Sequence, residues 1–255
     1  MTNLFNLTGR VALITGGSKG LGKAMARGFA EAGADSIISS RHDDELRAAA
    51  EEIGSGLNVQ VRSLVADMID RKAAQKMAED AIGAFGHVDI LVNNAGNNLP
   101  QDLTEITDDK WDYIFELNVT SCMLMSRALA PQMKDRRWGR IIYLSSVMAL
   151  GSNTGRSSYS ASKAALIGMC RAQALELGPF GITVNCLAPG PFLTDLPMNL
   201  LSHEQKESFA KRTALLRWAD PRELAGPALL LASEAGSYIT GTTLQVDGGI
   251  LCRTF

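Results

Sequence analysis

Three polar side chains in the middle of the sequence have the types and spacing that proton transfer needs. Tyr159 and Lys163 stand four residues apart in the run Y-S-A-S-K, so on a helix they project from the same face. The apolar residues 141–144 predict a strand that carries Ser146 to the same edge. A nearby cation favours the ionised form of a phenol, which makes Tyr159 a candidate acid or base. The same spacing also occurs on ordinary surface helices, so the pair needs supporting motifs.

A glycine-rich turn joins a predicted strand, residues 10–14, to a predicted helix, residues 24–32. It reads T-G-G-S-K-G-L-G, with the spacing T-G-x-x-x-G-x-G. Strand, glycine turn and helix form the context in which backbone N–H groups bind phosphate. We expect Gly16 to make the tight turn, Gly20 to let the backbone approach a pyrophosphate, and Gly22 to let the helix pack closely on the sheet. Ordinary loops also use glycine, but this placement favours a dinucleotide site.

The residues after the second predicted strand indicate which dinucleotide is bound. An acidic side chain at this position binds the ribose hydroxyls of NAD, but here Ser40 and Arg41 follow the strand. Arg41, together with Lys19 of the glycine turn, can pair with a 2′-phosphate, so the charges favour NADP over NAD. The alternative is that Arg41 opens the next helix in solvent, beside Asp43 and Asp44.

The rest of the chain continues as alternating strands and helices. The predicted strands are residues 36–39, 59–65, 88–92, 141–144, 182–187 and 243–246, and the predicted helices are residues 45–53, 72–85, a long stretch after Thr107, one from about 158, and 224–232. This alternation predicts an α/β fold, a Rossmann-type doubly wound parallel sheet with helices on both faces. Since no linker or repeat interrupts the chain, we expect one domain over residues 1–255, with a mobile substrate loop at about 191–210.

Composition excludes several classes of protein. The 255 residues carry 25 basic and 27 acidic side chains, a formal net charge of −2, so nucleic acid and anionic membranes are not expected partners. No apolar run reaches the ~18 residues of a membrane span, and no secretory signal is recognisable, which predicts a cytoplasmic protein. The four cysteines and three histidines are scattered without metal-ligand spacing, so we expect neither disulfides nor a metal.

Three further positions are candidates for the functional site because of their places relative to the predicted strands and helices. Asp67 follows the third strand, where it could bind the adenine edge or cap the next helix. The run N-N-A-G, residues 93–96, follows the fourth strand at the same edge of the sheet. Asn118 lies inside a predicted helix despite its poor helix propensity, so it should either hold a water or kink the helix.

These motifs occur together in one order, and together they are specific. They are T-G-G-S-K-G-L-G at residues 15–22, N-N-A-G at 93–96, Asn118, Ser146, Tyr159, Lys163, P-G at 189–190 and V-D-G-G at 246–249. Along essentially its whole length the chain resembles a classical short-chain dehydrogenase/reductase. The opening residues 4–9 and the segment 217–224 resemble the gluconate 5-dehydrogenase and 2-deoxygluconate 3-dehydrogenase branch, which suggests a sugar-acid or polyol substrate.

The resemblance implies catalytic roles at the matching positions. Tyr159 would be the acid/base, and Ser146 would hydrogen-bond the reacting oxygen. Lys163 would bind the nicotinamide ribose and favour the tyrosinate, while Asn118 would hold a water that links Lys163 to solvent. The cofactor would supply the hydride.

The glycine turn and the resemblance together predict the binding residues. The expected cofactor set is Gly16, Ser18, Lys19, Gly20, Leu21, Gly22, Ser40, Arg41, Asp67, Met68, Asn94, Ala95, Gly96, Tyr159, Lys163, Pro189, Gly190 and Thr194. The expected substrate pocket contains Ser146, Met148, Asn153, Tyr159, Phe192 and Leu196. This mixture of apolar and polar groups also suits a 3-oxoacyl thioester or a cyclic ketone, so the substrate stays open.

Two alternative functions stay open, and the resemblance also predicts an oligomeric state. A 3-oxoacyl thioester reductase would have the same active site, and a catalytically silent dinucleotide-binding regulator would keep only the fold. The resemblance also implies a homotetramer, in which the long helices around Asn118 and Tyr159 meet their symmetry mates. The apolar residues proposed for that surface, part of which must also cover the sheet, are Ala128, Leu129, Ala165, Leu166, Met169 and Ala172.

Overall fold

In the computed structural model, which describes residues 3–252, seven parallel strands form one sheet in the order β3-β2-β1-β4-β5-β6-β7. The strands are β1 (Val11–Thr15), β2 (Asp35–Ser40), β3 (Val61–Val65), β4 (Ile90–Asn93), β5 (Gly139–Leu144), β6 (Ile182–Pro189) and β7 (Thr243–Val246). The chain order reverses between β1 and β4, and in open α/β sheets the crevice at such a point receives the ligand. The predicted fold class is confirmed.

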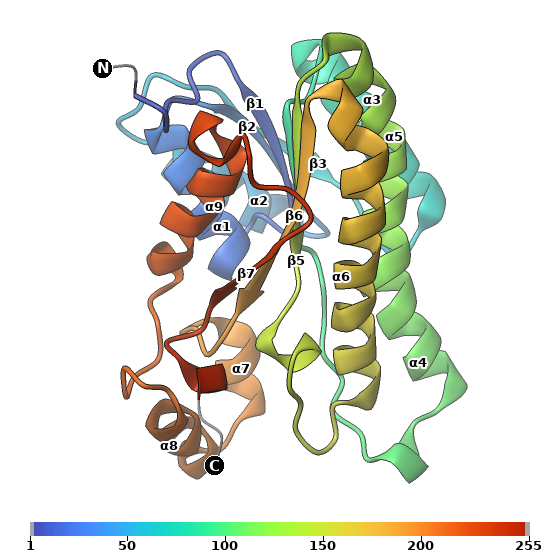
Figure 1. The fold of residues 1–255 in the computed structure, drawn as a ribbon, viewed down its shortest axis with the longest axis vertical. Coiled ribbons are helices and arrows are strands. Elements are labelled where there is room, and N and C mark those ends of the chain that lie inside the picture. Colours follow the sequence, from blue (N-terminus) through green and yellow to red (C-terminus); the bar gives the residue numbers. More distant parts are fainter. Residues whose placement is uncertain (1–2, 253–255) are drawn as a thin grey trace.

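Helices cover both faces of this sheet, as Figure 1 shows with the sheet seen nearly edge-on. One face carries α1 (Gly20–Glu31), α2 (Asp43–Gly54) and α9 (Ala225–Ala232), and the other carries α3 (Arg71–Phe85), α4 (Asp108–Phe115), α5 (Ser121–Arg136) and α6 (Ser157–Leu177). Among residues 3–252, no helix combines the length and the apolar character that a membrane span requires.

Two apolar layers hold the helices to the sheet, because successive side chains of a strand point to opposite faces. In β1, Leu13 packs under α3, α5 and α6, whereas Ile14 packs under α1, α2 and α9, and both are fully buried. Leu129 and Leu166, proposed above for a surface between subunits, are also fully buried in the first layer. That part of the assembly prediction is wrong, since both side chains are already used against the sheet.

The segment after β6 is helical rather than a loop. It forms α7 (Asp195–Leu200) and α8 (His203–Arg212), which lie at the carboxyl end of the strands in Figure 1. Ser202 starts α8 with a capping box: its hydroxyl accepts from the backbone N–H of Gln205 at 3.2 Å, while the Gln205 side chain accepts from the N–H of Ser202 at 2.9 Å. The run S-H-E-Q already carried this signal. Movement of the segment as a lid stays a prediction.

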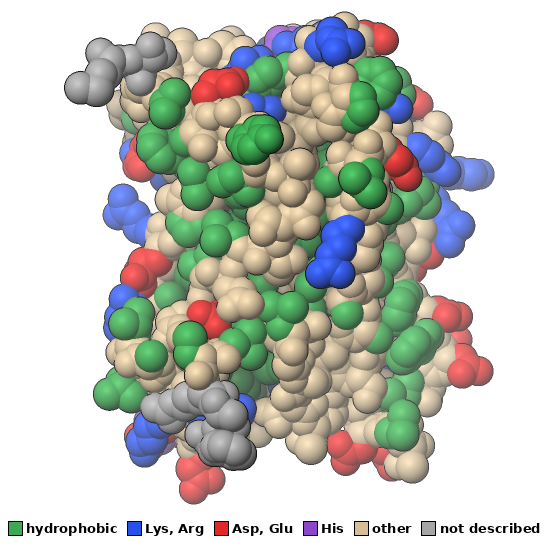
Figure 2. Space-filling view, in the orientation of Figure 1, with side chains coloured by type: hydrophobic (Ala, Val, Ile, Leu, Met, Phe, Trp, Pro, Cys, Tyr) green, Lys and Arg blue, Asp and Glu red, His purple; other side chains and the backbone are tan. Residues whose placement is uncertain are grey.

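The molecular face drawn in Figure 2 carries acidic and basic side chains that are interspersed rather than gathered by sign. This mixture matches the near-balanced composition of 25 basic and 27 acidic residues. On that face, therefore, no continuous basic surface is offered to a polyanion.

Candidate active site

A cavity of about 500 Å³ opens at the carboxyl ends of the strands, at the point where the chain order reverses. Its walls come from the glycine turn after β1, the ends of β2, β4, β5 and β6, the start of α6, and the α7–α8 segment. All eighteen residues predicted to bind the cofactor line this one cavity. The fold thus brings the predicted set together, while the contacts of each residue with a nucleotide stay predictions.

The glycine turn is locked to the end of β4 by a set of short hydrogen bonds. The Thr15 hydroxyl accepts from the N–H groups of Asn94 and Ala95, each at 3.0 Å. The side-chain amide of Asn94 donates to the carbonyls of Thr15 at 2.8 Å and Gly16 at 2.9 Å. Asn94 therefore holds the glycine turn in shape through hydrogen bonds to Thr15 and Gly16. The sequence alone did not predict these hydrogen bonds.

The glycines of this turn are needed for close approach, although not all as predicted. A Cβ at Gly22 would lie 2.3 Å from the Gly16 carbonyl oxygen, so Gly22 lets α1 pack on the turn itself. Packing on the sheet falls instead to Gly17, whose Cβ would lie 2.7 Å from the side chain of Ile38 in β2. Gly20 has φ +57°, a left-handed conformation that favours glycine. The backbone cradle therefore has no room for side chains.

The two cations predicted to meet a 2′-phosphate both line the cavity but differ in their surroundings. Lys19 Nζ lies 3.4 Å from a Glu45 carboxylate oxygen, and both side chains are largely exposed. Arg41 is exposed and forms no ion pair within residues 3–252. Arg41 is thus free to bind an anion, whereas Lys19 must share its charge with Glu45.

Asp67 also reaches the cavity, but it does not cap the following helix. Its carboxylate accepts from the N–H of Ile69 at 3.1 Å, in a tight local turn. The cap of α3 is Asp70, whose carboxylate accepts from Lys72 and Ala73. The capping alternative for Asp67 is therefore wrong, and its exposed carboxylate stays available at the cavity wall.

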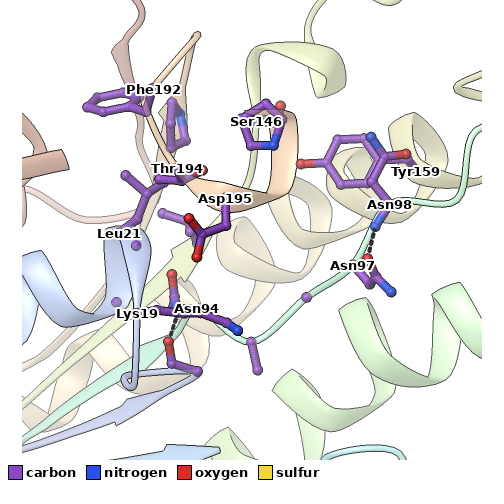
Figure 3. Close-up of a pocket in the computed structure, with 18 of the residues that line it drawn as sticks. Lys19, Leu21, Asn94, Asn97, Asn98, Ser146, Tyr159, Phe192, Thr194 and Asp195 are labelled. Carbon is purple, nitrogen blue, oxygen red and sulfur yellow. Dashed lines mark hydrogen bonds between the residues drawn. The ribbon is translucent and has the colours of Figure 1, made fainter. Parts of the chain in front are cut away.

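The acid/base candidates converge where β5 ends against the start of α6. Lys163 is 4% exposed, its ammonium donates to the Leu144 carbonyl at 2.7 Å, and it lies 5.7 Å from the centre of the Tyr159 ring. The Ser146 hydroxyl accepts from the N–H of Met148 at 3.1 Å, which fixes its position at the strand end. In the view of Figure 3, Ser146 lies at the edge of the pocket between Thr194 and Tyr159. This arrangement can hold a carbonyl or hydroxyl oxygen between two hydroxyl groups.

Asn118 lies in a π-helical turn, Glu116–Thr120, that links α4 to α5, and it is fully buried. Its side-chain oxygen accepts from the N–H of Asn97 at 2.9 Å. Its amide nitrogen donates to the Asn97 carbonyl and the Ser162 hydroxyl, both at 3.0 Å. The side chain thus links the segment after β4 to helix α6, so a water bound to Asn118 would have to use the backbone carbonyl of Asn118 instead. π-Helical turns in helices often mark functional sites.

The predicted substrate residues divide into three groups. Ser146, Met148, Tyr159 and Phe192 line the cavity. Asn153 lies outside it, in an exposed turn where its own side chain accepts from the N–H of Thr154 at 2.9 Å, so its assignment to the pocket is corrected. The side chain of Leu196 lies outside the described part of the chain.

Sequence reasoning missed several residues that line the same end of the cavity. They are Asn97, Asn98, Tyr113, Arg156, Phe209 and Trp218. Arg156 could have been found, because it precedes Tyr159 by three residues and such pairs are neighbours on a helix. Tyr113 and Trp218 gave no signal, since only the packing of α4 and of the segment after α8 brings them to the cavity.

Comparison with known proteins identifies what this architecture is similar to. A family model described as enoyl-(acyl carrier protein) reductase matches residues 16–251. The 2-dehydro-3-deoxy-D-gluconate 5-dehydrogenase of Dickeya dadantii is 39% identical over 98% of this chain and 99% of its own length. A 3-oxoacyl-[acyl-carrier-protein] reductase of Aquifex aeolicus is 35% identical over 96% of this chain and 98% of its own. The crystal structure of a gluconate 5-dehydrogenase from Burkholderia cenocepacia, in complex with NADP and tartrate, superposes with a TM-score of 0.93 at 32% identity, covering 98% of each chain.

Proposed function

The chain belongs to the short-chain dehydrogenase/reductase family, and we propose that it is an NADP-dependent oxidoreductase that interconverts a ketone and a secondary alcohol of a sugar acid. The observation that carries this proposal is that Tyr159, Lys163 and Ser146 line the same cavity as the glycine turn. Such a cavity holds a dinucleotide and a small substrate end to end.

The residues present fit NADP. Gly16, Gly20 and Gly22 line the cavity where α1 begins, so backbone N–H groups can bind a phosphate there. Arg41 offers a guanidinium without an ion-pair partner in residues 3–252. Relatives support the same cofactor, since the Burkholderia cenocepacia enzyme was crystallised with NADP. Preference for NADP over NAD is part of the proposal. When bound, NADP accepts or supplies the hydride.

In this mechanism, side chains of the protein transfer the proton. As a carbonyl is reduced, the Tyr159 hydroxyl donates its proton to the oxygen, and in the oxidative direction the tyrosinate takes the hydroxyl proton. The Ser146 hydroxyl donates a hydrogen bond to the same oxygen. The Lys163 ammonium, held by the Leu144 carbonyl at 2.7 Å, lies 5.7 Å from the centre of the Tyr159 ring and can bind the ribose. Asn118 keeps the wall behind them in place through Asn97 and Ser162.

Sugar acids are favoured by the names of the relatives. The Dickeya dadantii enzyme acts on 2-dehydro-3-deoxy-D-gluconate by its name, and the Burkholderia cenocepacia structure holds tartrate, a hydroxy acid. The similarity to a 3-oxoacyl-[acyl-carrier-protein] reductase at 35% identity supports a second candidate, reduction of a 3-oxoacyl thioester. A silent regulator is disfavoured, because the acid/base set is complete.

A carbonyl and alcohol panel, run with both cofactors, tests the function. It should contain sugar acids, matched neutral polyols and ketoses, and an acetoacetyl thioester. We expect turnover of sugar acids with NADP, lowered about 100-fold or more by Tyr159→Phe while NADPH still binds. Faster turnover of the thioester would favour the second candidate. Near-normal activity of the variant would remove Tyr159 from its role.

We further propose that the protein assembles as a homotetramer through helix α6. With Leu129 and Leu166 buried, the exposed stripe of α6 carries Ala164, Gly168, Ala172 and Leu175 at helical spacing, with Arg171 among them. Leu175 is 82% exposed, which is unusual for a large aliphatic side chain in a helix of a folded protein. Small residues let two antiparallel copies of the helix approach closely, as a two-fold interface requires.

A further inference from the structure

Arg156 presents an unpaired positive charge inside the cavity. It precedes helix α6 as its N-cap residue and lines the cavity with Tyr159, which follows one helical turn later. The atom Nη1 of Arg156 has no contact with solvent and no hydrogen-bond partner, and no carboxylate pairs with the guanidinium anywhere in residues 3–252. A buried hydrogen-bond donor without a partner destabilises the fold. Such a donor in a cavity wall therefore indicates a ligand that accepts a hydrogen bond from it.

An arginine that is more deeply buried than Arg156 has partners for its guanidinium. Arg140, in β5, is 2% exposed, donates to the Gly139 carbonyl at 2.9 Å, and lies 3.6 Å from the carboxylate of Glu234. Arg140 therefore has partners for its buried guanidinium, whereas the atom Nη1 of Arg156, at the cavity, has none. Burial lowers the pKa of the Arg156 guanidinium, an effect that the neighbouring Tyr159 partly offsets.

No acidic residue in the cavity wall neutralises Arg156. The carboxylates that line the cavity are Glu45, Asp67 and Asp195. Glu45 pairs with Lys19, and Asp67 stands at the end of β3. Figure 3 shows Asp195 across the pocket from Tyr159. Tyr159 and Lys163, which also line the cavity, belong to the helix that Arg156 precedes, and neither supplies a carboxylate.

A second orphan group lies beside the same tyrosine. The side-chain oxygen of Asn98 is buried without a hydrogen-bond partner, and Asn98 lines the cavity next to Tyr159 in Figure 3. Its backbone is held in place because its N–H donates to the side-chain oxygen of Asn97 at 2.8 Å, and Asn97 is in turn clamped by Asn118. An acceptor without a donor and a cation without an anion therefore line the same cavity as Tyr159.

We propose that Arg156 binds the carboxylate of the substrate and that Asn98 accepts a hydrogen bond from one of its hydroxyl groups. This inference rests on the proposed function and narrows it: the substrate is a hydroxy or keto acid whose carboxylate lies within a few bonds of the reacting carbon. A guanidinium matches a carboxylate with two parallel hydrogen bonds. A carrier-bound thioester is neutral near its reacting carbon, and its nearest anion lies at the far end of the pantetheine arm.

The experiment compares acids with their neutral counterparts in wild type and Arg156→Gln. Hexonates and keto-hexonates are each paired with the matched polyol or ketose, and kcat/KM is measured with NADP(H). We expect wild type to prefer the acids, and the ratio of acid to neutral kcat/KM to fall about 10- to 100-fold in the variant, mainly through KM. Arg156→Lys should recover part of this ratio, because lysine keeps the positive charge but cannot make the two parallel hydrogen bonds of a guanidinium. Arg47→Gln, an exposed arginine of α2 that does not line the cavity, is the control.

A binding measurement reports on the site without turnover. D-Gluconate, added with NADP, should raise the Tm of wild type and not that of Arg156→Gln, whereas D-glucitol should act equally on both. Without ligand the variant should melt no lower than wild type, since the change removes an unsatisfied buried donor. Equal handling of acids and neutral compounds by wild type, or an acid preference that survives in Arg156→Gln, would overturn the inference. Absence of turnover across the whole panel would instead overturn the proposed function.

Discussion

Cofactor choice depends on one exposed guanidinium, so Arg41→Ala should change it by a predictable amount. A charge-assisted hydrogen bond to phosphate contributes about 1.5–3 kcal/mol. Arg41 is exposed, and solvent screening therefore places its contribution at the lower end, about 1.5 kcal/mol. That free energy corresponds to roughly a tenfold loss of kcat/KM for NADP. The value for NAD, which lacks the 2′-phosphate, should stay within about twofold.

Lys19 should matter less than Arg41, because the structure already gives its ammonium a partner. The Glu45 carboxylate lies 3.4 Å from Lys19 Nζ and stands in the wall that would face the 2′-phosphate. Two unit charges 4 Å apart in water interact by about 1 kcal/mol. Glu45→Gln should therefore raise the preference for NADP by about fivefold, and Lys19→Ala should lower it less than Arg41→Ala does.

The assay is the ratio of kcat/KM for NADP to that for NAD, measured with one substrate at low and high salt. Arg47→Ala is the control, since Arg47 is an exposed arginine of α2 that pairs with Asp43 at 2.7 Å and does not line the cavity. The Arg41 effect should shrink as salt rises. A wild-type preference for NAD, a ratio unmoved by Arg41→Ala, or an equal shift in the Arg47 control would show that Arg41 is only a solvated charge at a helix start.

The remaining predictions concern catalysis, stability and assembly. Lys163→Met should weaken NADPH binding and lower kcat together, as fluorescence titration and steady-state kinetics would reveal, and a change in neither would break the proposed link. Asn118→Ala leaves three buried hydrogen bonds unmade and should cost ~2–4 kcal/mol, a fall in Tm of about 5–12 °C by calorimetry; an unchanged Tm would contradict the clamp. The Arg217 guanidinium lowers the pKa of Glu223 to about 2 from its ordinary 4.5, so this carboxylate stabilises the fold above pH 4.5 and ceases to do so as the pH falls towards 2. The difference in Tm between wild type and Glu223→Gln should close over that window, and a constant difference would refute the assignment. Leu175→Glu should shift a sedimenting tetramer to smaller species, while a wild-type monomer at micromolar concentration would remove the assembly proposal.

Much of the cofactor cavity was predictable because parallel strands end at one edge. Each motif follows a strand: the glycine turn follows β1, Arg41 follows β2, Asn94 follows β4 and Ser146 follows β5. Once the alternation of strands and helices predicts a parallel sheet, these residues must gather at its carboxyl edge. For this reason all eighteen predicted cofactor residues line one cavity.

The errors arose where position depends on packing between distant segments. Asn153 follows the strand-end rule only loosely, and the exposed turn after β5 directs it to Thr154 instead of the cavity. Helical periodicity could not tell which apolar residues of α5 and α6 face the sheet, so Leu129 and Leu166 were assigned to the wrong surface. A helix packed on a sheet buries one side. The sequence predicts the helical spacing of the residues on that side, but it predicts less well which of the apolar residues they are.

The sequence by itself determined the fold class, the glycine cradle, and the Tyr159–Lys163 pair, because each depends on local spacing or on the topology of a parallel sheet. Tertiary structure alone decided that Asn118 joins Asn97 to Ser162 and that Arg156 faces the cavity without a partner. Whether a polar side chain is satisfied depends on every group that surrounds it, and those groups come from parts of the chain far apart in sequence. Hydrogen-bond satisfaction is therefore the property of this site that no spacing rule could supply.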